Sequence, residues 1–480
     1  MILTLGVSVA VSIVFGVLLL RLLWPRDVAC SLPLLVALGG GLGAGLSAVL
    51  MFLWIVVLGP TRWFPLAEGV LLCLIAGATY ARRSGSALAQ PGSQSLRDTR
   101  MGMLLAAAFL LAIVAAASAF IAILRQHPHG QWDAWMNWDL RARMLVRGGS
   151  QWRAAFSGAI PWSHPDYPVL VPSLVARTWL YAGTETMLGP ALVAATFTFG
   201  TVGLLVAALA ALRSTSQGLL AGLVLLATPF FILHGTSLYA DVPLGFFFLA
   251  TTVCVALDGR HGEVTSRFAV LAGVAAGLAM WTKNEGNLIA LAMVVGLFLG
   301  GANDSGPARR RRLLAFGRGL LAMLVLVAGF KIALAPPNDL LSTLAVDRTI
   351  GRLTDPGRYF LVFREYARHI TSFGNNGLVA VVWVLIAYML GLGLSRPELS
   401  RSWLRSVTLA LVALLAGHFM VFVSMADELL RLLDSSLDRL LLQLWPSALF
   451  LYFMMVRTLE EVGTEGRVSK PVSRLRDVQL

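Results

Sequence analysis

Charged side chains are scarce in this sequence: Asp, Glu, Lys and Arg make up 13% of its 480 residues. A soluble globular protein carries about 25%, so a large water-exposed surface is excluded. Hydrophobic residues account for 57% of the chain, and the mean hydropathy is +0.77. Apolar runs of about 20 residues, the length of a helix that crosses a bilayer, recur from end to end. The sequence therefore predicts an all-α polytopic integral membrane protein.

Cysteine is also rare. Cys30, Cys73 and Cys254 are the only three, and each lies in or beside an apolar run. No pair has metal or redox spacing, so we expect them to be packing residues. The first apolar run, 2–20, has no basic start and no small-residue cleavage site, which favours a retained anchor.

The net charge of +13 comes mostly from arginine. The arginines lie between apolar runs, as the positive-inside rule requires. They form no basic stripe with interleaved aromatic residues, so no nucleic-acid partner is expected.

Thirteen apolar segments are predicted to cross the membrane: 3–20, 32–58, 66–81, 101–124, 189–212, 217–233, 242–257, 268–282, 287–300, 314–335, 373–393, 404–425 and 440–456. They divide the chain into additional N-terminal helices (1–100), a transmembrane core (101–457) and a cytoplasmic tail (458–480). Residues 84–99 form a polar linker within the first part.

Thirteen crossings put four basic groups on one side: Arg82, Arg83, Arg97 and Arg100; Arg309 to Arg312; Arg396, Arg401 and Arg405; and Arg467, Lys470, Arg474 and Arg476. This side is predicted to be cytoplasmic, so the N-terminus is external and the C-terminus cytoplasmic. Segment 168–181 is apolar but short and contains Arg177. We expect it to be a helix at the outer surface, within a large external segment, 125–188, because a crossing there would move the four consecutive arginines outside.

The external segment begins with QWDAWMNWDLRARML, 131–145, in which Trp132, Trp135 and Trp138 recur every three residues. Tryptophan at this spacing is typical of an interfacial helix. Asp133 lies between two of the indoles. Partial loss of water there raises the proton affinity of a carboxylate, which suits a general base.

Arg141 and Arg143 follow in the same motif. Their guanidinium groups suit an anionic phosphate, and anchoring to anionic lipid headgroups explains them equally well. Further on, SHPDYP presents His164, Asp166 and Tyr167 between two prolines that fix an extended turn. This turn is a candidate binding element or a capped loop before a helix.

The motif LYADVPL places Tyr239 and Asp241 at the outer end of a predicted span. Asp241 is a candidate site residue, and it also fits an N-cap, since Pro243 suits the first turn of a helix.

The motif WTKNEG interrupts about 33 apolar residues with Lys283 and Glu285. Two helices of roughly 15 residues are too short to span about 30 Å comfortably. A short helical hairpin of this kind leaves a recess in the outer leaflet, where the Lys283 ammonium could bind a lipid phosphate. A surface turn closed by a Lys283–Glu285 ion pair is the alternative.

The last motif is LLDSSLDRLLLQLWP, 432–446. Asp434, Ser435 or Ser436 could cap the following helix. Asp438 then suits its first turn, whereas Arg439 opposes the helix dipole. Arg439 therefore points to an external anion, or to a salt bridge with Asp438 or another external carboxylate.

Together these motifs resemble the GT-C superfamily of membrane glycosyltransferases, in particular bacterial proteins similar to dolichyl-phosphate-mannose protein mannosyltransferases and lipid A aminoarabinose transferases. The resemblance covers about residues 100–455 and rests on the order of the five motifs. It implies a bacterial inner-membrane enzyme that transfers a hexose or pentose, with inversion, from a polyprenyl-phosphate donor to a glycan, lipid or protein acceptor at the external (periplasmic) face.

In this resemblance Asp133 matches the catalytic base and Asp241 the second external aspartate. His164, Asp166 and Tyr167 match a family HPPL element in part. The family's second acidic residue beside the base is here Ala134, so the need for a divalent metal is left open, and no other cofactor is indicated.

The chemistry is consistent with the residues themselves. One base for the acceptor hydroxyl and several cations for the departing phosphate are sufficient, and Lys283, Arg439 and Arg141 or Arg143 could supply the cations. A transporter or flippase for a lipid-linked or anionic substrate is the alternative. It would favour two repeated halves with broken helices, which the sequence does not display, and the polar groups gather on one predicted face.

Overall fold

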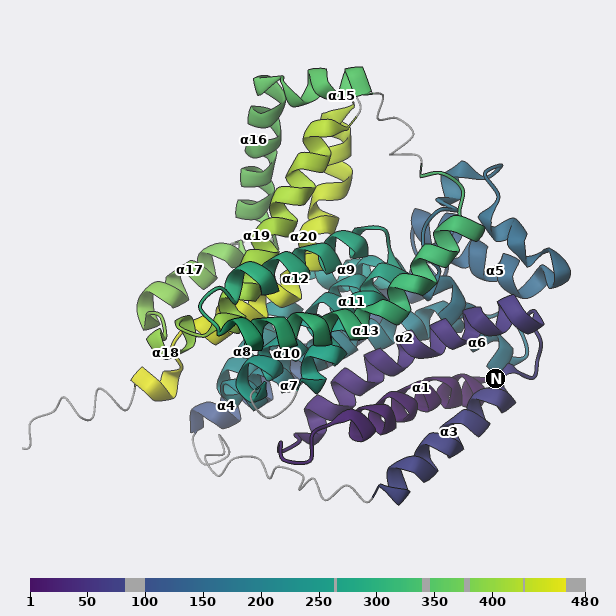
Figure 1. The fold of residues 1–480 in the computed structure, drawn as a ribbon, viewed down its shortest axis with the longest axis horizontal. Helices are drawn as coiled ribbons and strands as arrows, with labels where there is room; N and C mark the ends of the chain where they lie inside the picture. The colour runs from purple at the N-terminus through teal and green to yellow at the C-terminus, as the bar shows by residue number, and fades with distance from the viewer. Residues whose placement is uncertain (83–99, 263–265, 339–345, 375–379, 426–427, 463–480) are drawn as a thin grey trace, which may run out of the picture.

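The computed structural model describes residues 1–82, 100–262, 266–338, 346–374, 380–425 and 428–462, and every regular element in them is a helix. Eight helices are long and apolar enough to cross a membrane. They are α1 (Ile2–Leu23), α2 (Leu32–Leu58), α3 (Phe64–Ala81), α4 (Arg100–Gln126), α7 (Leu188–Leu212), α10 (Asp241–His261), α13 (Gly306–Ala333) and α19 (Ser402–Ser424). The all-α membrane architecture expected from composition is confirmed (Figure 1).

The expected count of thirteen spans is not confirmed. The segment 217–233 is a pair of helices, α8 (Thr215–Leu226) and α9 (Pro229–Thr236), bent by 65° at a break before Pro229. Three other segments are shorter helices: α11 (Arg267–Thr282), α12 (Glu285–Gly300) and α17 (Val381–Leu392). A helix of 16 residues is about 24 Å long, less than the hydrocarbon thickness of about 30 Å. The short hairpin expected around Lys283 is therefore present.

α10 lies at the centre of the molecule, packed against α7, α11, α20 (Leu429–Met455) and α2. Of its most apolar 18 residues, 94% are buried. Glycines let the surrounding helices approach closely: a Cβ on Gly41 of α2 would overlap the ring of Phe246, and one on Gly16 of α1 would lie 1.9 Å from the Gly39 carbonyl oxygen. Small residues at helix contacts are typical of membrane bundles.

The N-terminal helices share this core. α2 packs against α7 and against α6 (Leu170–Ala182), and α6 also contacts α1 and α3. Ten consecutive residues of α6 are buried, including Arg177, so this helix is packed inside the protein. A 13-residue helix is too short to cross, which agrees with the expectation that it is not a span.

An ion pair compensates the charge that α6 carries into the bundle. Arg177 forms an ion pair of 2.8 Å with Glu68 of α3, and both side chains are fully buried. Arg177 also donates to the carbonyl oxygen of Ser8 in α1, and the hydroxyl of Tyr181 donates to Glu68. This network joins three helices near one end of the bundle.

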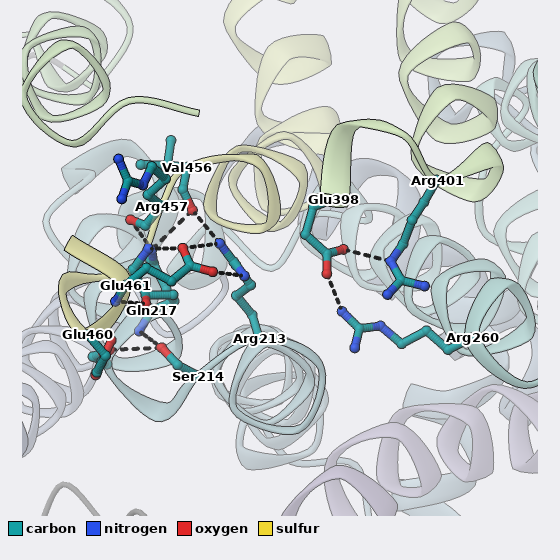
Figure 2. Close-up of polar contacts among 12 residues, drawn as sticks. Arg213, Ser214, Gln217, Arg260, Glu398, Arg401, Val456, Arg457, Glu460 and Glu461 are labelled. Atoms are coloured by element: carbon teal, nitrogen blue, oxygen red, sulfur yellow. Dashed lines mark hydrogen bonds and ion pairs between the residues drawn. The ribbon is translucent and has the colours of Figure 1, made fainter. Parts of the chain in front are cut away.

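A second polar network lies at the C-terminal end of α10 (Figure 2). Arg260, in its last turn, pairs with Glu398 of α18 (Arg396–Leu399) at 3.1 Å. Arg213, directly after α7, pairs with Glu461 at 2.8 Å and fastens the segment that follows α20. Residues 241 and 260 are separated by about 28 Å along the helix at 1.5 Å per residue, so this network and Asp241 lie at opposite ends of the bundle.

Two further helices, α15 (Val346–Leu353) and α16 (Pro356–Ser372), project from the bundle, where α16 lies beside the first half of α20 (Figure 1). Of the cysteines, Cys30 and Cys254 are buried as expected, whereas Cys73 is exposed on α3. The linker 84–99, Arg83, Arg97 and residues 463–480 of the tail, with their basic side chains Arg467, Lys470, Arg474 and Arg476, lie outside the described residues.

Candidate functional site

Asp133 stands at the start of an irregular helical segment. It precedes a π-helical turn, η2 (Ala134–Trp138), which leads into α5 (Asp139–Arg147). Single π-turns occur frequently at functional sites. The backbone N–H of Asp133 donates to the Tyr239 hydroxyl at 3.4 Å, which fixes this turn against the loop before α10.

The three tryptophans around Asp133 divide into two kinds. Trp132 and Trp135 are exposed, with ring centroids 4.8 Å apart, as an interfacial position predicts. Trp138 is buried and stacks on Tyr167 at 6.0 Å. Only part of the tryptophan motif is therefore available to lipid or to a substrate.

Arg439 connects the two aspartates singled out in the sequence. Its Nη2 donates to Asp133 Oδ2 at 2.8 Å and to Asp241 Oδ2 at 2.9 Å. Its guanidinium also lies over the Tyr239 ring, 4.7 Å from the centroid. Of the two salt bridges expected as alternatives to an anion, the one to another carboxylate is present, with Asp133 and Asp241 as the partners. Asp438 instead lies 2.7 Å from His369 Nδ1.

The capping expected before Arg439 is wrong. α20 begins at Leu429, so Asp434, Ser435 and Ser436 lie inside the helix. The helix extends further because its first turns bury Leu429, Leu433 and Leu437 against α16, around Val362 and Tyr366.

Asp241 is fully buried and its carboxylate has three partners. Lys283 Nζ lies 3.0 Å from Oδ1, and Gln443 Nε2 donates to the same oxygen at 2.6 Å. Arg439 binds Oδ2. The N-cap interpretation is wrong: α10 starts at Asp241 itself, with Ala240 at the cap position and no side-chain cap bond. The sequence missed Gln443, although it lies one helical turn after Arg439.

Lys283 lies in the turn between α11 and α12, and its side chain is 5% exposed. It also pairs with Glu285 at 2.7 Å, so the expected Lys283–Glu285 contact exists, but Lys283 is buried and not part of a surface turn. Burial opposes its charge, yet Asp241 and Glu285 outweigh burial and raise the pKa of Lys283. Its Nζ lies 5.8 Å from the centroid of the Tyr167 ring.

The SHPDYP turn packs on this hairpin. Asp166 is buried and accepts hydrogen bonds from Asn284 Nδ2 at 2.7 Å and from Asn338 Nδ2 at 2.6 Å. Lys331 of α13 donates to Asn284 Oδ1 at 2.8 Å. His164 has a left-handed backbone (φ 45°) and stacks on Tyr167 with centroids 5.1 Å apart. Burial and the charge of Glu285 raise the pKa of Tyr167.

Arg141 and Arg143 bind elsewhere. Arg141 is fully buried and donates to the carbonyl oxygen of Tyr167 at 2.6 Å, and burial lowers its pKa to about 9. Arg143 pairs with Glu185 at 3.7 Å. Arg141 thus holds the turn that carries Tyr167, and Arg143 holds the start of α7 through the loop before it.

The five charged side chains of this cluster differ in their exposure to solvent. Asp133, Arg439 and Glu285 are 27%, 24% and 21% exposed at their side chains, whereas Asp241 and Lys283 are buried. Three carboxylates face two cations, so the five side chains carry a net charge of −1 when all are ionised. Asp133, Arg439 and Glu285 are therefore the members of the cluster that solvent reaches, next to the buried pair of Asp241 and Lys283.

The described residues contain one group of His and carboxylate side chains close enough to hold a metal ion, Glu365, His369 and Asp434. It joins α16 to α20, outside the cluster around Asp241. The guanidinium of Arg368 already binds all three: it contacts Asp434, lies 2.6 Å from Glu365 Oε2 and 3.1 Å from His369 Nε2. An internal cation therefore occupies the position that a metal would need.

Comparisons of the chain with protein-family models, with curated proteins and with solved structures found no match. The resemblance to GT-C enzymes therefore stays an expectation that rests on the order of the sequence motifs.

Proposed function

We propose that this protein is a membrane glycosyltransferase that uses a polyprenyl-phosphate-linked sugar. The observation that carries the proposal is the arrangement of Asp133, Arg439 and Asp241. The partly exposed Asp133 accepts a hydrogen bond from Arg439, and the buried Asp241 holds the guanidinium of Arg439 in place.

In this proposal the donor phosphate competes with Asp133 for Arg439. The donor is a phosphodiester, and its two free oxygens can accept the parallel hydrogen bonds that a guanidinium offers. When phosphate replaces Asp133 on Arg439, the Asp133 carboxylate loses this hydrogen-bond donor, and its oxygen becomes free to accept the proton of the acceptor hydroxyl. Donor binding thereby releases the base for the acceptor.

The transfer step then balances without a further reagent. The acceptor hydroxyl oxygen forms a bond to the anomeric carbon as its proton passes to Asp133. The bond from that carbon to the phosphate oxygen breaks, and its electron pair leaves with the polyprenyl phosphate. Attack from the face opposite the phosphate inverts the anomeric centre. Arg439 and Lys283 stabilise the charge on the leaving phosphate.

The GT-C-like layout, with thirteen crossings and the cluster at the external face, belongs to the same proposal. Support comes from the position of the cluster at the end of α10 remote from Arg260 and from the arginines of the α13 start. By the positive-inside rule the arginine-rich end is cytoplasmic, which puts Asp133 at the periplasmic face of a bacterial inner membrane.

Native mass spectrometry of the protein in mild detergent tests the proposal. We expect a polyprenyl phosphate or its glycoside on the wild type and its loss in Arg439→Gln, with Arg431→Gln as the control. Arg431 is on the same helix, is 84% exposed and contacts only Glu428 among the ion pairs described. Bulk phospholipid alone on the wild type would overturn the donor assignment.

A flippase or transporter is a second candidate, because α8 and α9 form a helix pair bent by 65°, and broken helices build transporter sites. Transfer of radiolabelled sugar to an acceptor fraction separates the two functions. An enzyme releases free polyprenyl phosphate in detergent, where no membrane sides exist, whereas a transporter leaves the glycoside intact.

A further inference from the structure

The first turns of α13 border a recess of about 580 Å³ that the proposed reaction does not use. Arg310, Arg311 and Arg318 line it, together with Leu314 and with Ser266 at the start of α11. Positions 310, 311, 314 and 318 recur at the spacing of one helical face. The three arginines therefore line the same recess.

The neighbouring arginines of the same run behave differently. Arg312 is held by Asp258 at 2.8 Å and by Asp304 at 2.7 Å, and Arg309 lies over the Phe298 ring at 5.1 Å. Arg310 and Arg318 are exposed, and no carboxylate is among the described residues that line the recess. Charge complementarity thus selects an anion for this hollow.

Beyond the recess the same face of α13 is apolar and uncovered. Leu321 and Val325 are 57% and 64% exposed and follow Arg318 at helical spacing, and Leu314, at the edge of the recess, is 50% exposed. A free phosphate would use only the arginines. A phospholipid would use both parts, with its phosphate in the recess and an acyl chain along the leucines.

The recess lies at the end of the bundle opposite the candidate site. Arg311 donates to the carbonyl oxygen of Gly262, and Arg312 binds Asp258, both at the end of α10 remote from Asp241. A ligand here is therefore separate from the donor proposed above.

We propose that this recess is a binding site for the phosphate headgroup of an anionic membrane phospholipid, whose acyl chain lies on Leu314, Leu321 and Val325. Basic pockets between membrane helices bind anionic headgroups in this way. The inference does not depend on the proposed glycosyltransferase activity.

Lipid binding to the full-length protein in mild detergent tests this site, measured by native mass spectrometry with phosphatidylglycerol and with phosphatidylcholine. We expect phosphatidylglycerol to bind more tightly. The double variant Arg310→Ala, Arg318→Ala should weaken its binding about thirtyfold, while phosphatidylcholine binding stays the same. Both arginines are exposed, so an unchanged melting temperature should show that the variant folds.

Arg309→Ala is the matched control, because it removes the same charge from the same helix outside the recess. Wild-type affinity in the double variant, or an equal loss in Arg309→Ala, would overturn the site. Displacement of phosphatidylglycerol by an equal concentration of inorganic phosphate would assign the recess to a soluble phosphate and overturn the lipid.

Discussion

Arg439 Nη2 donates to Asp133 Oδ2 at 2.8 Å, although 306 positions separate the two residues in the chain. The contact joins α20 to the segment between α4 and α5, beside the loop that carries Tyr239. Because the same nitrogen also binds the buried Asp241, a change at any of the three residues alters the partners of the other two.

Asp133→Asn should abolish sugar transfer, because an amide keeps the shape of the carboxylate and cannot take a proton. Removal of a general base lowers turnover by about 10²- to 10⁴-fold. Transfer of a radiolabelled sugar measures this loss, and donor binding should persist. Glu428→Gln, a carboxyl-to-amide change at an exposed residue, should retain activity. Turnover of Asp133→Asn within threefold of the wild type would remove Asp133 from the role of base.

Arg439→Lys should weaken binding of polyprenyl phosphate about tenfold or more. The guanidinium reaches two carboxylates with Nε and Nη2, whereas a single ammonium loses at least one charge-assisted hydrogen bond. Titration of the lipid against protein fluorescence gives the affinity. Arg431→Lys serves as the control, and equal affinities in the two variants would contradict the phosphate site.

Asp139 makes the stability pH-dependent. Burial raises the pKa of Asp139 to about 7, against the opposing charge of Arg143. The folded state favours the protonated carboxyl, so stability is lost as the pH rises from about 4 to about 7 and is constant above. The free energy of unfolding of Asp139→Asn should therefore rise relative to that of the wild type, by up to about 1.4 kcal/mol for each pH unit in that window. Melting temperatures at pH 5 and pH 8 check this, and an equal difference at both would refute it.

Glu68→Ala should destabilise the protein by about 3–5 kcal/mol, because it leaves the buried guanidinium of Arg177 without its counter-charge. The double variant Glu68→Leu, Arg177→Met removes both charges and should recover most of the loss. Thermal unfolding in detergent compares the two. A double variant less stable than the single one would show that the ion pair contributes net stability.

The two ends of the bundle should lie on opposite sides of the membrane. Ser150 is exposed in the segment after α5, and Ala302 is exposed after α12, at the end remote from Glu285. In a chain without its native cysteines, Ser150→Cys should react with an impermeant thiol reagent in intact spheroplasts, and Ala302→Cys only after lysis. The reverse pattern would invert the topology.

Sequence reasoning found the charged members of the cluster because a charge in an apolar chain is costly and therefore conspicuous. Asp133, Asp241, Lys283 and Arg439 were each singled out in their own motif, and the structure brings them into contact. Which charge pairs with which could not be read from the sequence. The contacts depend on how α10, α11 and α20 pack.

The neutral partners and the helix boundaries escaped prediction for different reasons. Gln443 and Asn284 carry uncharged amides. An uncharged polar residue is less conspicuous in this sequence than a charged one. The start of α20 was inferred from capping residues, but packing of Leu433 and Leu437 on α16 extends the helix beyond them. Similarly, the burial of α6 could not be predicted, because Glu68, the partner of Arg177, is 109 residues away and leaves no local signal in the sequence.

The burial of α10 has a consequence for how the protein is made. Asp241 enters the bilayer near the middle of synthesis, Lys283 follows 42 residues later, and Arg439 and Gln443 arrive 198 and 202 residues later. Until α20 emerges from the ribosome, the carboxylate at the centre of the bundle lacks two of its three partners. The contacts around Asp241 are therefore completed only when α20 is made, and a nascent chain that stops before residue 439 leaves this carboxylate with Lys283 but without Arg439 and Gln443.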